Sequence, residues 1–441
     1  MEKQEKRHIL GFYENELTNN LLFYWLPRCE DKEFGGFINC FDSTGKTLMS
    51  TDKYTWSQGR FVWIFATLAT MKSDTFCQNQ KEEFKRLARQ GKDFLKKHCL
   101  LGENDWRCVY LMNREGVAKH VDGYDVIDAS IYADCFVVNA FAKVTKMDKN
   151  FDDWIFAKSL YCSIKERLDS GTYHTLPYPL KHCYRAHGIP MIMTNVAKEM
   201  YDAAIEMEKS YCEELKNDLR VYTLDTMENF VDDNYKLREV IYQNNQWVDG
   251  ILGTHINPGH IIENIWFILD AMKIDCSLNT SEMLEKLVQI TLNALKLGWD
   301  DVYGGIFHYA DYEGGALKEK PEDYQNIPVL HYALTNTSGK IWWVHSEALY
   351  TILRLYIMTG KEEFWKWYKK IEAYVFEKFP NRDREVREWI QSLDRQGKMK
   401  QKAVGLPVKD PYHIMRNVIL IIELLYEEVN GTEPGRDIYG D

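Results

Sequence analysis

Two groups that can exchange a proton near neutral pH lie close together in the stretch 257–263, which reads Asn-Pro-Gly-His-Ile-Ile-Glu. The proline and the glycine interrupt whatever precedes them, and the apolar run 261–272 then predicts a helix. His260 falls in the first turn of that helix, and Glu263 follows three residues later on the same face. An imidazole beside a carboxylate is suited to general acid–base catalysis. The simpler interpretation of this stretch is a helix cap.

Three other polar clusters stand where further helices are predicted to begin. They are Trp56, Gln58 and Arg60, then Trp342, Trp343, His345 and Glu347, and finally Asp410-Pro411-Tyr412-His413. Each cluster also has an ordinary structural interpretation as a cap, a core aromatic pair or an ion pair. If the helix entrances meet at one cleft, the clusters together supply histidines, an arginine and carboxylates for proton transfer.

Other catalytic signatures are weaker in this sequence. It has no phosphate-binding loop, no dinucleotide-type glycine run, no His-Glu-x-x-His zinc motif and no nucleophile elbow. A pair of carboxylates for glycoside hydrolysis stays open as an alternative. The helix entrances carry mainly histidine and arginine, which favours proton transfer over glycosyl transfer.

Helical periodicity dominates the rest of the chain. Apolar residues recur at helical spacing around 61–68, 85–97, 130–145, 152–166, 190–208, 261–272, 282–296, 348–356, 362–379 and 414–425. This pattern predicts about ten to twelve helices. Long loops are expected at 42–53, 103–127, 170–190, 238–258, 300–340 and 395–412. Because these loops are rich in His, Asp, Tyr and Trp, they suggest a functional face.

One arrangement of residues occurs twice. A Gly-Gly turn at 33–37 precedes the polar-aromatic helix entrance at 56–60, and a second Gly-Gly turn at 302–307 precedes the entrance at 341–347. Repeated helical hairpins of this kind predict an all-α toroid whose entrances converge on a central cleft, with short β-hairpins in the loops. No Pro/Gly/Ser-rich linker divides the chain, so a single domain 1–441 is expected. Chance similarity of two Gly-Gly turns is the alternative.

Composition narrows the class of function. The 441 residues carry a formal charge of -11, which argues against nucleic acid as a partner. The 13 Trp, 27 Tyr and 20 Phe suit a sugar-binding cleft, although most of them must be core residues. The 10 Cys include no C-x-x-C pair. With no signal-like or membrane-spanning segment in the sequence, we expect a reduced, cytoplasmic protein that has no membrane partner.

The four clusters, in this order and spacing, resemble the N-acylglucosamine 2-epimerase family. The matching stretches are 52–63, 257–260 and 340–348, supported by Trp299-Asp300 before Gly304-Gly305 and by Glu388-Trp389 before Gly397-Lys398. The likeness covers about residues 10–428. It implies an (α/α)6 barrel that interconverts a sugar at C2.

The resemblance also implies roles for individual residues. His260 and His413 correspond to two catalytic histidines, Arg60 to an essential arginine, and Glu263 and Glu347 to carboxylates of the cleft. Glu263 would orient the imidazole of His260. Substrate contacts are expected at Trp56, Gln58, Tyr132, Asn195, Asn257, Trp343 and His345, and no metal is expected.

The expected substrate pair is N-acetyl-D-glucosamine and N-acetyl-D-mannosamine, interconverted by proton abstraction and return through an enediolate. The Asn-Pro-Gly-His version and Asn195, which aligns where other branches carry a histidine, favour this pair. The Asp-Pro-Tyr-His version at 410–413 looks like the cellobiose 2-epimerase branch. That epimerase and a mannose isomerase are therefore alternatives, ahead of a glycoside hydrolase or a non-catalytic binding protein. The resemblance implies no required cofactor, ATP as a non-consumed activator, and a homodimer.

Overall fold

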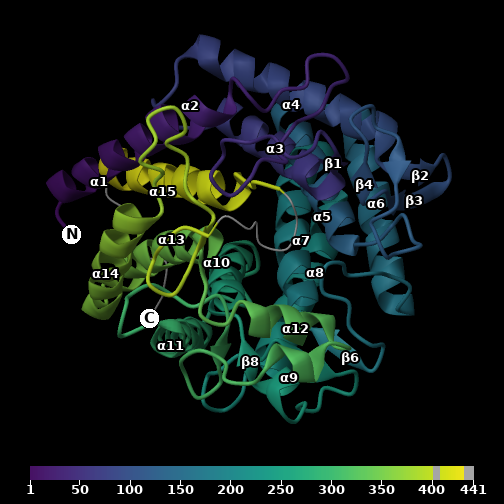
Figure 1. Cartoon of the computed structure of the whole chain (residues 1–441). Helices are drawn as coiled ribbons and strands as arrows, with labels where there is room; N and C mark the ends of the chain where they lie inside the picture. The colour runs from purple at the N-terminus through teal and green to yellow at the C-terminus, as the bar shows by residue number, and fades with distance from the viewer. Residues whose placement is uncertain (401–407, 432–441) are drawn as a thin grey trace.

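The computed structural model describes residues 1–400 and 408–431. Six of its helices form a closed ring in which each helix packs against the next. In chain order they are α3 (Thr55–Ala69), α5 (Ile131–Asp148), α7 (Gly188–Met207), α10 (Pro258–Ile274), α13 (Trp342–Thr359) and α15 (Tyr412–Asn430). The last helix closes the ring against the first, so α15 lies beside both α3 and the N-terminal α1 (Figure 1).

A second layer of helices surrounds this ring. Each outer helix packs mainly against one inner helix: α1 (Lys3–Glu16) on α15, α4 (Gln78–His98) on α3, α6 (Phe151–Ser170) on α5, α8 (Cys212–Asp225) on α7, α11 (Ser281–Gly298) on α10 and α14 (Glu362–Lys378) on α13. The main hydrophobic core includes residues of both layers. This arrangement is an (α/α)6 barrel and confirms the predicted fold class.

The two layers have different sequence patterns because they meet different surroundings. Inner helices are buried on nearly every face, so α10 and α13 carry apolar residues on all sides, with a minority of buried polar ones. Outer helices bury one stripe only. On α4 that stripe is Phe84, Leu87, Ala88, Gly91, Phe94 and Leu95, at helical spacing, while its other faces carry charge.

Short antiparallel sheets stand beside the barrel, and several of them lead into inner helices. The pairs are β1 (Lys53–Tyr54) with β4 (Leu111–Met112), β4 with β5 (Ala118–Lys119), β2 (Leu100–Gly102) with β3 (Asp105–Cys108), β6 (Tyr184–Ala186) with β7 (Val240–Tyr242), β8 (His255–Ile256) with β9 (Ala310–Asp311) and β10 (Lys340–Ile341) with β11 (Ser392–Leu393). Strands β1, β6, β8 and β10 end within two residues of α3, α7, α10 and α13. The sheets therefore fix where these inner helices begin.

The two Gly-Gly turns are held by the same kind of ion-pair network. Lys53 Nζ lies 3.0 Å from Asp31 Oδ2, and Arg114 also binds Asp31. Lys340 Nζ lies 3.1 Å from Asp300 Oδ2, and Arg395 also binds Asp300. Both lysines are fully buried. The duplication seen in the sequence is therefore a duplication of structure.

All ten predicted helical segments are helices, but several elements were not predicted. Helices α1 and α8 complete the outer layer, and α2 (Leu22–Trp25) and α9 (Ile251–Thr254) are single turns. The prediction of 300–340 as a loop is wrong at α12 (Pro328–Thr335). This helix is short, begins at a proline and packs in a small separate cluster with Val248, Ile251 and Tyr309. Of the predicted loop 395–412, residues 401–407 lie outside the described residues.

Two findings concern membrane-spanning helices and disulfide bonds. In the part of the chain that the structure describes, none of the helices is both long and apolar enough to cross a bilayer. All ten cysteines are free thiols.

Candidate active site

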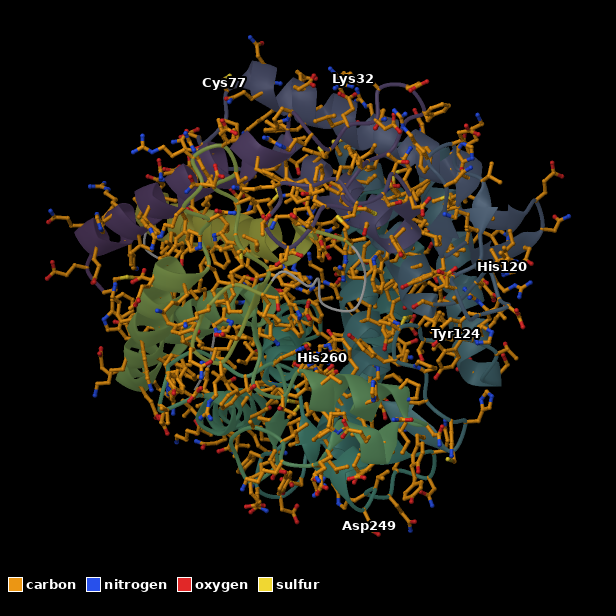
Figure 2. The ribbon with its side chains drawn as sticks, viewed as in Figure 1. Lys32, Cys77, His120, Tyr124, Asp249 and His260 are labelled. Carbon is orange, nitrogen blue, oxygen red and sulfur yellow. The ribbon has the colours of Figure 1, made fainter. Side chains whose placement is uncertain are left out.

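A cavity of about 210 Å³ opens where the six inner helices begin. Every inner helix contributes to its wall near its N-terminus: Arg60 from α3, Tyr132 from α5, Met191 from α7, His260 from α10, Trp343 from α13 and His413 from α15. Figure 2 shows His260 toward the middle of the ring, whereas Lys32, Cys77, His120 and Asp249 lie at its rim. The helix entrances therefore converge as predicted.

The first turn of α10 is capped by Asn257 and carries His260. Asn257 Oδ1 accepts hydrogen bonds from the backbone N–H groups of Gly259 and His260, at 3.1 and 3.3 Å. A Cβ at Gly259 would lie 2.4 Å from the ring of Trp343, so only glycine allows this indole to approach the helix. The cap interpretation is correct for Asn257, and the capped turn places His260 in the cavity wall.

The carboxylate that contacts His260 is Glu239. Its Oε2 lies 3.0 Å from His260 Nδ1. The expectation that Glu263 orients this imidazole is wrong, because Glu263 instead binds Arg416. Burial disfavours a charge on His260, but Glu239, with a smaller contribution from Glu263, outweighs burial and raises the pKa of His260 above its ordinary value. Glu239 lies within the predicted loop 238–258, and no local pattern distinguishes it there.

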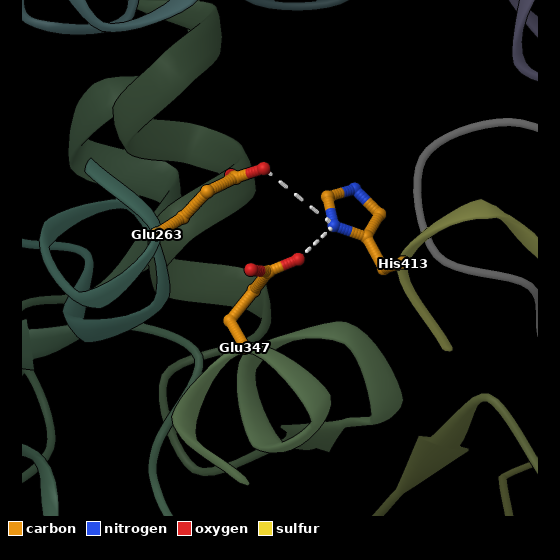
Figure 3. Close-up of side chains that lie close together, drawn as sticks. All are labelled: Glu263, Glu347 and His413. Atoms are coloured by element: carbon orange, nitrogen blue, oxygen red, sulfur yellow. Dashed lines mark hydrogen bonds and ion pairs between the residues drawn. The ribbon is translucent and has the colours of Figure 1, made fainter. Parts of the chain in front are cut away.

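His413 has a carboxylate partner of its own (Figure 3). Its Nδ1 lies 2.7 Å from Glu347 Oε1 and 3.8 Å from Glu263 Oε1. Arg416 binds both carboxylates, and Trp266 Nε1 donates to Glu347 Oε2 at 2.9 Å. Burial opposes ionisation of Glu347, yet Arg416 and His413 hold its pKa at about 2.

The same group has the donor set of a cation site. Ligand atoms of Glu263, Glu347 and His413 all lie within 4.8 Å of one another. The guanidinium of Arg416 already binds both carboxylates. A protein cation therefore supplies the positive charge that these carboxylates require.

A single indole lies against both histidines. The ring centroid of Trp343 is 5.3 Å from that of His260 and 5.3 Å from that of His413. Each histidine has Nδ1 engaged by a carboxylate, which leaves Nε2 as the nitrogen that can meet a ligand. The cavity therefore holds two imidazoles, each oriented by its own carboxylate, around one aromatic surface.

Arg60 brings a positive charge to the same cavity. Its Nη1 donates to Asp410 Oδ2, and its guanidinium lies 4.1 Å from the ring centroid of Phe136. Asp410 Oδ1 accepts the backbone N–H of Tyr412 at 2.8 Å, where α15 begins. Asp410 thus links Arg60 to the helix that carries His413.

The structure separates the expected substrate contacts into two sets. Trp56, Tyr132, Asn257 and Trp343 line the cavity. Gln58, Asn195 and His345 are buried and do not line it. Gln58 binds the backbone N–H and C=O of Phe37, while His345 Nε2 accepts the N–H of Ile306 at 2.9 Å. Asn195 Oδ1 accepts from Asn139 Nδ2 at 2.8 Å. We therefore withdraw the substrate contacts assigned to these three residues.

Sequence reasoning also missed His308, a buried histidine in the cavity wall. It lies in the loop between α11 and β9, and its ring is edge-on to Trp343 at 5.8 Å. Burial, reinforced by the nearby His260, lowers the pKa of His308 far below its ordinary value. Its Nδ1 has no hydrogen-bond partner among the described residues. A neutral imidazole therefore stands beside the two that contact carboxylates.

Comparisons with known proteins bear on the expected family. The model of the N-acylglucosamine 2-epimerase (GlcNAc 2-epimerase) family matches residues 36–417. The N-acylglucosamine 2-epimerase of Mus musculus is 25% identical over 448 residues, which cover 98% of this chain and 96% of that protein.

Solved structures share the fold. The cellobiose 2-epimerase of Bacillus thermoamylovorans has a TM-score of 0.74 at 18% identity, covering 95% of this chain and 100% of that one. A D-mannose isomerase has a TM-score of 0.71 at 17% identity, covering 94% and 98%. At these identities the structures support the fold alone. The family model covers most of the sequence, and the chain therefore belongs to the N-acylglucosamine 2-epimerase family.

Proposed function

We propose that this protein interconverts N-acetyl-D-glucosamine and N-acetyl-D-mannosamine. Its family makes it a carbohydrate epimerase, and relatives that match nearly its whole length are N-acylglucosamine 2-epimerases. One observation carries the proposal. Two imidazoles with separate carboxylate partners lie against the same indole, Trp343, in a cavity that also contains Arg60.

The chemistry follows from the acidity of the C2 hydrogen in the open-chain sugar. The C1 carbonyl withdraws electrons, so a neutral imidazole can take the C2 proton and leave an enediolate. A protonated imidazole on the other side then returns a proton to C2, and the C1 carbonyl forms again. His260 and His413 are the two bases in this proposal. Two groups are needed because epimerisation requires the proton to leave one face of C2 and return to the other.

Arg60 is placed to stabilise the enediolate. Negative charge develops at O1 when the C2 proton leaves, and a donor already held in position stabilises that charge at no reorganisation cost. One such donor is typically worth about 3–4 kcal/mol. The Asp410 carboxylate holds Arg60 Nη1, which fixes the direction of the guanidinium.

The N-acyl group needs an apolar surface for its methyl. With Asn195 outside the cavity, the wall formed by Phe136, Met191 and Ile192 offers such a surface. These side chains come from the first two turns of α5 and α7. Trp56 and Trp343 provide aromatic faces for the sugar itself.

A glycoside hydrolase is less well supported by this geometry. Hydrolysis needs two carboxyl groups that can act on the glycosidic oxygen and on C1. Among the described residues, the carboxylates of the cavity wall are Glu263 and Asp410, and each is bound to an arginine. Neither is therefore available as a general acid.

Product analysis in heavy water tests the proposal. N-acetylmannosamine incubated with the enzyme in D2O should give N-acetylglucosamine carrying deuterium at C2, seen by loss of the H2 signal in proton NMR. The His413→Ala variant, checked for retained helicity by circular dichroism, should give no product. Formation of a ketose from mannose, with no turnover of N-acetylmannosamine, would instead identify an aldose–ketose isomerase. Turnover of cellobiose alone would identify a cellobiose 2-epimerase.

Three properties stay predictions. The family resemblance implies activation by ATP without its consumption and a homodimer, and the sequence pattern implies a cytoplasmic location. Assays with and without ATP, sedimentation at equilibrium and cell fractionation test them in turn. No metal is proposed, so activity should survive dialysis against a chelator.

A further inference from the structure

We propose that Glu239 is the positioning residue that keeps His260 protonated in the resting enzyme, so that His260 is the proton donor in the direction of the reaction that starts from this state. This inference deepens the proposed function and rests on it. It assigns to His260 a starting state that the reaction alone does not define.

A small sheet brings Glu239 to this position. Strands β6 and β7 pair antiparallel with Ala186 opposite Val240, so the residues that flank them, His187 and Glu239, are neighbours. The backbone N–H of His187 donates to the carbonyl of Glu239 at 3.0 Å. His187 is also the N-cap residue of α7. The Glu239 side chain is therefore fixed to the same framework that forms the cavity wall.

Among the described residues, no permanent cation lies within 4.0 Å of the Glu239 carboxylate. The basic groups within that distance are two imidazoles: Oε2 lies 3.0 Å from His260 Nδ1, and Oε1 lies 3.8 Å from His187 Nδ1. The second ring nitrogen of His187, Nε2, lies 2.9 Å from Asn264 Nδ2. Because His260 makes the shorter contact, it is the group best placed to neutralise Glu239.

The carboxylate beside His413 is in the opposite situation. Glu347 binds Arg416, which is always charged, and Arg416 binds Glu263 as well. A carboxylate whose charge is already compensated by a guanidinium stabilises a neighbouring imidazolium less than an uncompensated one. The two histidines have similar hydrogen bonds to carboxylates, but among the described residues only the carboxylate that contacts His260 lacks an arginine partner.

The other titratable groups around His260 support this assignment. On its own helix, Glu263 also raises the pKa of His260, but less than Glu239 does, and it is bound by Arg416. From β8, His255 has its pKa lowered by burial, and from the loop before β9, His308 has its pKa lowered further. Both are therefore neutral at working pH. From α15, His413 lies across Trp343. Glu239 is thus the negative charge that acts most strongly on His260.

The Glu239→Gln variant tests the inference through the pH profile of kcat/KM. Glutamine keeps the size of the side chain and removes its charge. The alkaline limb, where the donor loses its proton, should move to lower pH by about 1–3 units. The acidic limb should stay in place. The Glu239→Asp variant keeps the charge and should return the alkaline limb toward the wild-type position. A loss of kcat in Glu239→Gln with both limbs unmoved would mean a structural role only and would overturn the inference.

The Glu228→Gln variant is the matched control, because Glu228 is an exposed glutamate of the same segment of the chain. Its profile should equal that of the wild type. A shift in this variant would show that net charge, and not contact with His260, moves the limb.

A titration without substrate separates this inference from the proposed function. In wild-type enzyme with 15N-labelled histidine, the His260 resonance can be assigned by its loss in His260→Asn. Its midpoint should lie above the ordinary value for a histidine, about 6.5, and should fall in Glu239→Gln. A wild-type midpoint at or below that value would overturn the inference even if epimerase activity is found. A raised midpoint would support it even if the substrate proves to be a different sugar, or if Glu239→Gln does not fold.

Discussion

Gln58 and His345 perform the same structural task in the two halves of the chain. Gln58 Oε1 accepts the backbone N–H of Phe37, and His345 Nε2 accepts the backbone N–H of Ile306. Each acceptor follows a buried lysine by five positions, and each binds the residue directly after a Gly-Gly turn. Gly36 and Gly305 have positive φ angles of 69° and 81°, which glycine adopts without strain. Both side chains therefore tie a turn to the start of an inner helix.

Gln58→Ala and His345→Ala should lower stability without changing substrate affinity. Each variant leaves a buried backbone N–H unsatisfied, which costs about 1–3 kcal/mol. Thermal unfolding should show a lower midpoint for both, while KM of the folded enzyme stays at the wild-type value. Gln78→Ala, at an exposed position on α4, is the control and should have little effect on either quantity. A large rise in KM with unchanged stability would restore these residues to the substrate site.

Arg60→Ala should lower kcat by about 100- to 1000-fold, because a donor aimed at the developing charge on O1 is lost. Arg60→Lys should recover only part of this loss, since lysine cannot hold Asp410 and reach the substrate with a planar fork. Steady-state kinetics with N-acetylmannosamine measure both variants. Arg89→Ala is the control variant. It removes an exposed ion pair between Arg89, on the outer helix α4, and Asp148. A loss below about threefold for Arg60→Ala would remove Arg60 from the proposed mechanism.

Local patterns predicted the helices and the cap at Asn257, but they did not distinguish residues on opposite faces of one helix. Gln58 lies two residues from Arg60, and His345 lies two residues from Trp343. Residues two apart on a helix do not face each other, so one member of each pair lines the cavity and the other does not. Trp56 and Arg60 are four apart and share the cavity wall. Helical geometry applied to the clusters would have predicted which of these residues line the cavity.

Glu239 could not be found in the same way. Its position depends on pairing between β6 and β7, strands more than fifty residues apart in sequence, each only three residues long. Such short strands have no recognisable alternation. Arg416 could not be predicted from the sequence for a different reason. It lies within the apolar stripe of α15, where a sequence pattern predicts core, and only its two carboxylate partners from α10 and α13 explain it.

Preference for N-acylated sugars should depend on the apolar wall and not on Asn195. Ile192→Thr keeps the branched shape but puts a hydroxyl where the acyl methyl is proposed to lie, so kcat/KM for N-acetylmannosamine should fall relative to that for mannose. Asn195→Ala should leave this ratio unchanged and lower stability, because Asn139 loses its partner. Competition assays with both sugars measure the ratio. A change in the ratio for Asn195→Ala alone would return the acyl contact to that residue.

Acid should weaken the fold through Glu347. Its pKa of about 2 in the folded protein lies below the ordinary value of 4.5. A lowered carboxyl pKa contributes stability that is present above the unfolded value and is lost as pH falls from about 4.5 toward 2. The contribution is on the order of 3 kcal/mol. Thermal midpoints of wild type and Glu347→Gln, measured from pH 6 to pH 3, should therefore converge as the pH falls. A difference that stays constant over this range would show that Glu347 stabilises the protein by packing and not by its charge.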